Sequence, residues 1–301
     1  MEMASELWHV RAATRADTGR ITTLLRHAAW THFHADWRLP GEWIGEPGFV
    51  LAEPVDGGSL AGCLCVAPDP PPAAWVRLAA VRDRGGVDLM AEMMAAAITA
   101  VRASGLHAIA LLGQDEQLNN WLPSLGFSIV NQVITFVNDD LNSPPSLSRR
   151  NSDAAVRNVR LDDLVRLVAI ERAAFDPIWR HSRDGLALGW QNSLSFHVAV
   201  LTGTVVGFQY STRSERPGAA HLVRLTVDPA HQRCGVGSAL LAAALDSYRA
   251  QGYHTVSLNT QADNAASRHL YERFGFHLAG FAVPVWQRKL PAYDFVAGSD
   301  I

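Results

Sequence analysis

Short apolar runs alternate with segments of helical periodicity along the second half of the chain. The helical segments repeat their apolar residues every three or four positions, whereas the runs between them are β-rich and bounded by Gly and polar turns. Strands are predicted over 155–159, 196–200, 205–210, 221–227, 255–258, 276–281 and 285–290, and helices over 161–174, 238–250 and 265–274. This order predicts an α/β fold built on a mixed sheet, with two closing strands.

The first half repeats this order of elements. Matched residues lie 146 positions apart through most of each half and 149 apart near its end, so the first copy has lost three residues after Val81. The matched pairs are Arg11 and Arg157, Asp17 and Asp163, Val81 and Val227, and Gly126-Phe127 and Gly275-Phe276. A constant offset of this kind indicates a duplication.

A polar segment with Pro144-Pro145 and no apolar periodicity separates the two halves. Such a composition is typical of an exposed linker. We therefore expect a first domain over residues 1–140, a linker over 141–153 and a second domain over 154–301.

Composition narrows the class of protein. Hydrophobic residues make up 48% of the 301 residues and charged residues 18%, which is enough to build packed cores. The net charge of −3 argues against a nucleic-acid partner. Neither a signal peptide nor an apolar stretch near the roughly 18 residues needed to span a bilayer is visible. We expect a soluble, cytoplasmic protein without a membrane partner, and the sequence does not indicate its oligomeric state.

A Gly-containing turn connects the strand ending at Val227 to the next predicted helix. A helix N-terminus presents backbone N–H groups without intrahelical partners, and its dipole favours anions. The turn runs through Gln232, Arg233, Cys234, Gly235, Val236, Gly237 and Ser238. Taken alone, this turn fits a pyrophosphate cradle or an ordinary turn without a ligand.

A second motif follows 27 residues beyond Gly237. Asn264 and Tyr271 are seven residues apart, so they share one helix face, and Gly275-Phe276 follows them. Together, the Gln-x-x-Gly-x-Gly turn and this motif resemble the GNAT superfamily of acyl-CoA-dependent N-acetyltransferases. The resemblance covers residues 154–290, and the first half resembles the same fold, so two tandem GNAT-fold domains are expected.

The resemblance implies a role for each matched position. The turn would hold the pyrophosphate of acetyl-CoA through backbone amides, and Leu225, Thr226 and Val227 would bond the pantetheine arm and orient the thioester carbonyl. Asn264 would bond the pantetheine or the turn. Tyr271 would give a proton to the departing thiolate, although a core aromatic with a satisfied hydroxyl is the alternative. No metal is implied.

The general base is less defined. Some relatives carry a Glu at the position of Asn259, so that base is absent here, and others carry a Glu at the position of His221. Simple alternation would place His221 with Val223, Leu225 and Val227 on one face of the strand. A histidine suits proton transfer near neutral pH, and an uninvolved edge residue is the alternative.

The first half lacks the matching chemistry. Its turn over 82–88 is shorter, Leu122 takes the place of Tyr271, Asp115 that of Asn264 and Trp75 that of His221. We expect a degenerate copy that keeps the fold, packs against the second domain and shapes the acceptor cleft.

The sequence therefore predicts an N-acetyltransferase that moves an acetyl group from acetyl-CoA directly to a primary amine of a small molecule or peptide. Three alternatives remain: a non-catalytic acyl-CoA sensor, a member of the mycothiol synthase family, and a tandem transferase using aminoacyl-tRNA. The last would need a basic face and no coenzyme A turn. The segments expected to bind the acceptor, 176–194 and 213–219, carry no signature of its identity or of the preferred acyl chain.

Overall fold

The computed structural model describes residues 7–83, 86–141 and 152–291. The chain divides into two compact units, one of residues 1–129 and 286–301 and the other of residues 130–285. The boundaries of these units differ from those of the domains expected from sequence. Unit 2 begins at residue 130, before the predicted linker over 141–153, and it ends at residue 285, beyond which the chain is assigned to unit 1. Most of the predicted linker, including Pro144-Pro145, lies outside the described residues.

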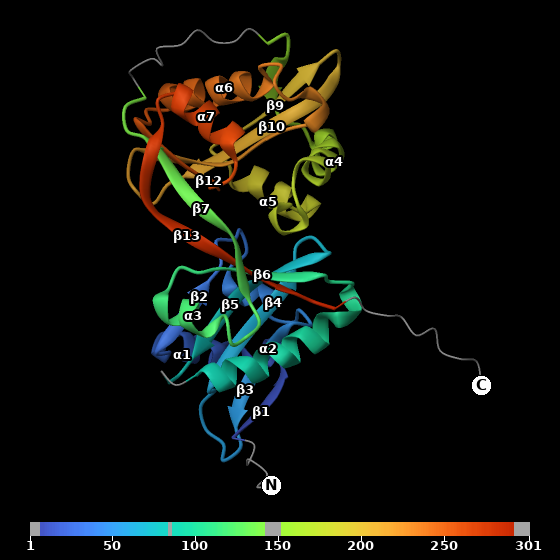
Figure 1. The fold of residues 1–301 in the computed structure, drawn as a ribbon, viewed down its shortest axis with the longest axis vertical. Helices are drawn as coiled ribbons and strands as arrows, with labels where there is room; N and C mark the ends of the chain where they lie inside the picture. Colours follow the sequence, from blue (N-terminus) through green and yellow to red (C-terminus); the bar gives the residue numbers. More distant parts are fainter. Residues whose placement is uncertain (1–6, 84–85, 142–151, 292–301) are drawn as a thin grey trace, which may run out of the picture. The chain divides into compact units, whose positions relative to one another are not determined.

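Unit 2 is a mixed sheet with helices on both faces (Figure 1). Its strands are β7 (Ser128–Asn138), β8 (Ala155–Asn158), β9 (Ser195–Leu201), β10 (Thr204–Arg213), β11 (Ala219–Val227), β12 (Thr255–Gln261) and the first part of β13 (His277–Lys289), in the order β13-β7-β12-β11-β10-β9-β8. Strands β11 and β12 pair in parallel, whereas the pairs β12–β7, β11–β10, β10–β9 and β9–β8 are antiparallel. The helices are α4 (Leu164–Ala174), α5 (Arg183–Asn192), α6 (Val236–Ala250) and α7 (Ala265–Arg273). Helices α6 and α7 cover one face, and α4 and α5 cover the other.

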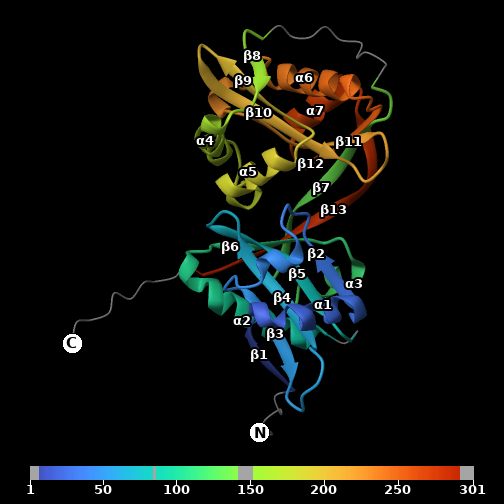
Figure 2. The same cartoon turned by 180° about the vertical axis from the view of Figure 1, so that it is seen from behind.

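Unit 1 has the same design (Figure 2). Its strands are β1 (Trp8–Ala12), β2 (Trp30–Phe33), β3 (Phe49–Pro54), β4 (Gly62–Pro68), β5 (Ala73–Val81) and β6 (Ala108–Leu112), and its helices are α1 (Thr18–His27), α2 (Val87–Val101) and α3 (Glu116–Trp121). The order is β1-β3-β4-β5-β6-β13, with β2 paired to β5 outside this path. Helices α2 and α3 pack on one apolar face and α1 on the other.

The end of the chain departs from the prediction. One strand, β13, replaces the two closing strands expected over 276–281 and 285–290. Pro284 lies inside β13, where its fixed φ is compatible with extended backbone even though it offers no N–H. From Trp286 onward the strand belongs to unit 1, where the Trp286 indole donates to Asn119 Oδ1 at 2.8 Å. Helix α5 lies within the segment 176–194, for which the sequence defined no helix bounds; only Leu186 and Gly189 of this helix are buried.

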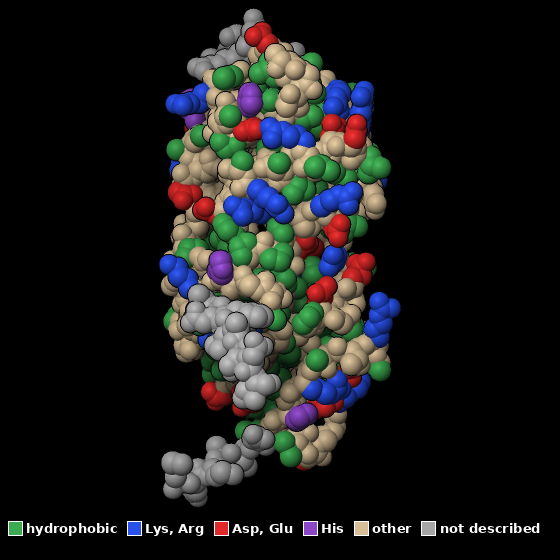
Figure 3. Space-filling view, turned by 90° about the vertical axis from the view of Figure 1, so that its right-hand side faces the viewer, with side chains coloured by type: hydrophobic (Ala, Val, Ile, Leu, Met, Phe, Trp, Pro, Cys, Tyr) green, Lys and Arg blue, Asp and Glu red, His purple; other side chains and the backbone are tan. Residues whose placement is uncertain are grey.

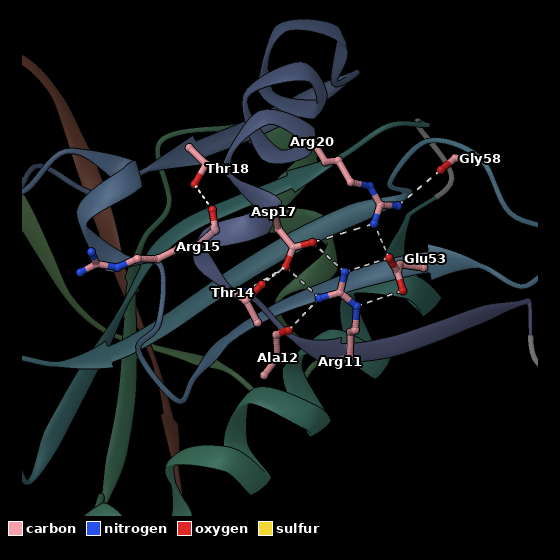
Figure 4. Close-up of polar contacts among 9 residues, drawn as sticks. All are labelled: Arg11, Ala12, Thr14, Arg15, Asp17, Thr18, Arg20, Glu53 and Gly58. Atoms are coloured by element: carbon pink, nitrogen blue, oxygen red, sulfur yellow. Dashed lines mark hydrogen bonds and ion pairs between the residues drawn. The ribbon is translucent and has the colours of Figure 1, made fainter.

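The duplication is visible in matched contacts. In unit 1, Arg11 donates two bonds to Asp17, at 2.9 and 2.7 Å (Figure 4), and in unit 2 Arg157 donates two to Asp163, at 2.7 and 2.8 Å. Each pair ties a strand, β1 in unit 1 and β8 in unit 2, to the 3-10 turn that precedes the next helix. The predicted correspondence of these residues is therefore confirmed by identical geometry.

A β-bulge also recurs at the same place. In unit 1 the pairing of β4 with β5 skips Arg77, and in unit 2 the pairing of β10 with β11 skips Val223, 146 positions later. A bulge adds one residue to one strand and bends it. In both units the parallel pairing with the next strand stops just before the bulge, at Trp75 and at Leu222. The two strands then diverge.

Two surface findings concern possible partners. No helix in the described part of the chain is long and apolar enough to cross a membrane. On the face drawn in Figure 3, Lys and Arg side chains are interspersed with Asp and Glu, so that face shows no patch of a single sign.

Candidate active site

A cavity of about 510 Å³ lies in unit 2 where β11 and β12 diverge. Its walls are the end of α4, the ends of the two strands, the turn before α6 and one face of α7. The residues that line the cavity include Phe175, Arg224, Leu225, Thr226, Val227, Gln232, Arg233, Gly235, Gly237, Ser238, Asn259, Asn264 and Tyr271. The structure thus brings together the strand end, the turn and the α7 residues that the sequence singled out.

The turn before α6 is shaped to leave backbone N–H groups available. Gly235, the N-cap of α6, has a φ of +82°, and without a side chain it cannot cap the first turn of the helix. Arg233 also has a positive φ, of +62°, and lines the cavity. The first-turn amides, those of Val236, Gly237 and Ser238, have no intrahelical acceptor. The arrangement suits an anionic group such as a pyrophosphate.

Gly237 lies at the bottom of this turn. A Cβ built there would be 3.4 Å from Leu270 Cδ2 and 3.7 Å from Val227 Cγ2, which is ordinary van der Waals contact. The fold itself therefore tolerates a methyl group at Gly237, which lines the cavity. The predicted cradle residue Cys234 is exposed, and its thiol donates to the Gln232 carbonyl at 3.4 Å.

Helix α7 contributes Asn264 and Tyr271. The Asn264 side chain caps the helix by accepting from the Ser267 N–H at 3.1 Å. Tyr271 is 5% exposed and packs against Phe136 and Phe276. Burial raises the pKa of Tyr271 to about 12, with Ser267 and the charge of Arg224 acting in the opposite direction. The phenol is therefore protonated at neutral pH and can act as a hydrogen-bond donor in the cavity.

A buried ion pair supports the end of β11 and was missed in the sequence. The Glu171 carboxylate of α4 is fully buried and accepts from Arg224 Nε at 2.9 Å, from Arg224 Nη2, from Thr226 Oγ1 at 3.1 Å and from the His181 N–H at 3.0 Å. Burial alone would raise the pKa of Glu171, but the attraction of Arg224 outweighs it and lowers the pKa. The signal was present: Glu171 is the one charged residue in the apolar stripe that includes Leu164 and Leu167.

His221 lies elsewhere. It does not line the cavity, and its Nδ1 is 2.8 Å from Ser257 Oγ on β12. The prediction that it shares a face with Leu225 and Val227 is wrong, because the bulge at Val223 reverses the alternation. His221 instead shares a face with Arg224 and Thr226, whereas Leu225 and Val227 pack toward α6. Burial lowers the pKa of His221 below its ordinary value.

In unit 1, the residues that correspond to Asn264 and Tyr271 keep the capping and backbone hydrogen bonds but lack the phenol hydroxyl. Asp115 caps α3 by accepting from the Leu118 N–H at 3.0 Å, as Asn264 caps α7. At the other end of α3, the Phe127 N–H donates to the Leu122 carbonyl at 3.0 Å, just as the Phe276 N–H donates to the Tyr271 carbonyl at 3.1 Å. Leu122 is buried and has no polar group. The loss of Tyr271's hydroxyl and the shorter turn agree with the predicted degenerate copy.

In unit 2, a turn whose helix has no side-chain cap lies beside two diverging parallel strands, and a buried phenol lines the same cavity. Residues 164–276 match the model of the acetyltransferase (GNAT) family. This part of the chain is therefore similar to the GNAT acetyltransferases, and the chain carries two GNAT-like folds in tandem.

Similar proteins agree with this assignment. A mycothiol acetyltransferase of Propionibacterium freudenreichii is 33% identical over 127 residues, 39% of this chain and 41% of that protein. An N-acetylaspartate synthetase of Rattus norvegicus is 35% identical over 85 residues, 28% of each. The matches thus span well under half of these relatives' own length.

A solved tandem GNAT protein from the clavulanic acid biosynthesis pathway resembles the whole chain in fold. Its TM-score is 0.57 at 17% identity, and the likeness covers 94% of this chain and 98% of that one. At this identity the likeness concerns the fold alone. It confirms the predicted tandem arrangement.

Proposed function

We propose that this protein is an acetyl-CoA-dependent N-acetyltransferase that transfers an acetyl group directly to a primary amine. The observation that carries the proposal is the convergence, in one cavity of unit 2, of the uncapped N-terminus of α6, the free edge of β11 over 225–227 and the phenol of Tyr271. Acetyl-CoA is a co-substrate here, and the proposal requires no metal; no group of metal-ligating side chains occurs among the described residues.

In this proposal the chain's own groups bind, orient and stabilise. The first-turn amides of α6 and Arg233 hold the phosphates, and the free backbone edge of β11 pairs with the pantetheine arm and polarises the carbonyl. The amine nitrogen forms the new bond to the carbonyl carbon, the carbon–sulfur bond breaks and the electron pair leaves on sulfur. Because the pKa of Tyr271 is about 12 and that of a thiol is roughly 8.5, the phenol stabilises the thiolate by donating a hydrogen bond rather than by full proton transfer.

An amine must lose a proton before it attacks. We propose that His221 accepts it through intervening water, since the ring does not line the cavity itself. Its lowered pKa means that it is neutral, and able to accept a proton, at neutral pH.

A mycothiol-synthase-like acceptor, an amine on a thiol-bearing sugar, is the second candidate. The observation that favours it is the set of mycothiol acetyltransferases among the relatives, at 30–41% identity over the matched stretches. A non-catalytic acyl-CoA sensor would need no phenol beside the leaving sulfur.

The test is release of free thiol from acetyl-CoA by the full chain in the presence of small amines, amino acids, peptides and an amino sugar thiol. Amine-dependent thiol release with a matching acetylated product supports the proposal. Binding of acetyl-CoA without turnover on any amine class would favour the sensor. Absence of acetyl-CoA binding would refute both.

A further inference from the structure

In unit 1, a short strand fills the place that forms the candidate active-site cavity in unit 2. Beyond the bulge at Arg77, β6 no longer covers the edge of β5, and β2 pairs with that edge instead. The pairing is antiparallel and joins Trp30 with Val81, Thr31 with Ala80, His32 with Ala79 and Phe33 with Leu78. The pairing is extended at both ends, by the Ala29 N–H on the Val81 carbonyl at 3.0 Å and the His34 N–H on the Arg77 carbonyl at 2.9 Å.

The matching edge in unit 2 has no strand paired to it among the described residues, and the Val227 carbonyl on it accepts a hydrogen bond from Gln232 Nε2 at 3.3 Å. Residues 225–227 pair with β10 on one side and line the cavity on the other. The segment that corresponds to β2, at the offset of 146 that holds for Asp17 and Val81 alike, is 176–179. There Pro177–Trp179 form a 3-10 turn and not a strand. Trp-Thr-His-Phe is a β-rich sequence, whereas a proline at the second position has no N–H and favours a turn.

The side chains of β2 also occupy the space beside β5 that corresponds to the cavity of unit 2. The Trp30 indole is 6% exposed, belongs to the main core of unit 1 and packs edge-on against Trp121. Its Nε1 donates to Asp115 Oδ1 at 3.0 Å. Asp115 is the counterpart of Asn264, so β2 bonds the very residue whose equivalent faces the cavity in unit 2.

His32 lies on the same face of β2 as Trp30. It is 4% exposed, its ring stacks at 6.5 Å from that of Trp30, and its Nε2 is 3.3 Å from the Val76 carbonyl. Burial lowers the pKa of His32 to about 4, so the ring is neutral and adds no charge to the filled fork.

We infer that β2 is a built-in occupant of the acyl-CoA channel of unit 1. It takes up the backbone bonds of β5 that a pantetheine arm would otherwise use, and so closes this unit to acyl-CoA. The comparison with unit 2 rests on the proposed function, but the pairing of β2 with β5 does not. The consequence is a tandem chain with a single acyl-CoA site.

The first test is hydrogen exchange of the full chain with and without saturating acetyl-CoA, together with calorimetric titration. We expect one site per chain, slower exchange over 225–238, and exchange over Trp30–Phe33 and 78–81 that is slow in both conditions and unchanged by the ligand. A second site, or any ligand-dependent change over Trp30–Phe33 or 78–81, would overturn the inference. Failure of the proposed function gives different results: binding at one site without turnover if the protein is a sensor, which leaves the inference standing, or no heat of binding at all if unit 2 is not an acyl-CoA site.

The second test is a matched pair of variants at His32. By the alternation of antiparallel pairing, counted from His34, the His32 N–H points at Ala79. His32→Pro removes that donor, and His32→Ala removes only the ring. We expect exchange over 78–81 to accelerate at least tenfold more in His32→Pro than in His32→Ala, with binding and KM at unit 2 unchanged in both. Equal exchange in the two variants would show that β2 is not what covers β5.

Discussion

The buried pair of Glu171 and Arg224 allows a quantitative test of how the acyl-CoA edge of β11 is held. Glu171→Gln keeps the size of the side chain but replaces an acceptor oxygen by an NH2 group facing the donors of Arg224. It also leaves the Arg224 guanidinium, whose side chain is 11% exposed, without its carboxylate counter-charge and with the Trp179 carbonyl as a neutral acceptor. Breaking one side of a buried pair costs about 3–5 kcal/mol.

A matched control is available in the same unit. Asp163→Asn is also a carboxylate-to-amide change at a nearly buried position, but its partner Arg157 is 31% exposed and stays hydrated. We expect a cost of about 1–2 kcal/mol, from a partly exposed pair and the backbone bond that Asp163 accepts from Arg160. Urea unfolding should be followed by hydrogen exchange in unit 2, because a chain with two units need not unfold in one step.

The same variant should affect function. Thr226 bonds Glu171, so the strand end over 225–227 should lose its fixed position and KM for acetyl-CoA should rise roughly tenfold. A double variant, Glu171→Leu with Arg224→Met, should regain most of the stability but not the low KM, because an apolar pair can replace a buried ion pair. Equal destabilisation by Glu171→Gln and Asp163→Asn would refute the reasoning.

Four further predictions follow from the site and its frame. Tyr271→Phe should lower kcat by roughly 10–10⁴-fold with little change in acetyl-CoA affinity, and an unchanged kcat in steady-state assays would return Tyr271 to a packing role. Gly237→Glu should weaken acetyl-CoA binding in calorimetry by at least about 100-fold, whereas Gly237→Ala, for which there is room, should bind nearly normally. The rise of kcat/KM with pH should have its midpoint below about 6.5, the ordinary pKa of a histidine, and should be absent in His221→Ala. An identical pH profile in wild type and His221→Ala would show that His221 is not the base. In unit 1, the bonds from Arg11 and Arg20 lower the pKa of Glu53 to about 2 from an ordinary 4.5, so this pairing stabilises the fold above pH 4.5 and is lost as pH falls toward 2; Glu53→Gln should flatten that part of the acid-unfolding curve.

The sequence predicted most elements of the fold and the groups that converge in the cavity. Local apolar periodicity suffices for the elements, whereas the groups of the cavity were identified through the resemblance of two motifs to a known family. The bulge at Val223 could not be predicted, since it is a mismatch between two strands and not a feature of one. It is the reason that His221 was assigned to the wrong face.

The other misses also depend on contacts distant in sequence. The pairing of Glu171 with Arg224 joins residues 53 positions apart, and the end of β13 joins unit 1 after more than 150 residues of unit 2. The first left a local trace, a carboxylate in an apolar stripe. The second left none, because an extended strand has the same pattern whichever sheet it enters.

The two units differ in the segment that lies beside the bulged strand, which is β5 in unit 1 and β11 in unit 2. Both copies keep the bulge, at Arg77 and at Val223, and so both keep the fork beyond it. A fork with an unpaired backbone edge is costly unless something bonds it, because buried N–H and C=O groups need partners. In unit 1 the edge is bonded by β2, so the fork is satisfied at all times. In unit 2 the corresponding segment is a proline turn, so no strand covers the edge, and in the proposed function the amide groups of the pantetheine arm would supply the bonding that β2 supplies in the other copy.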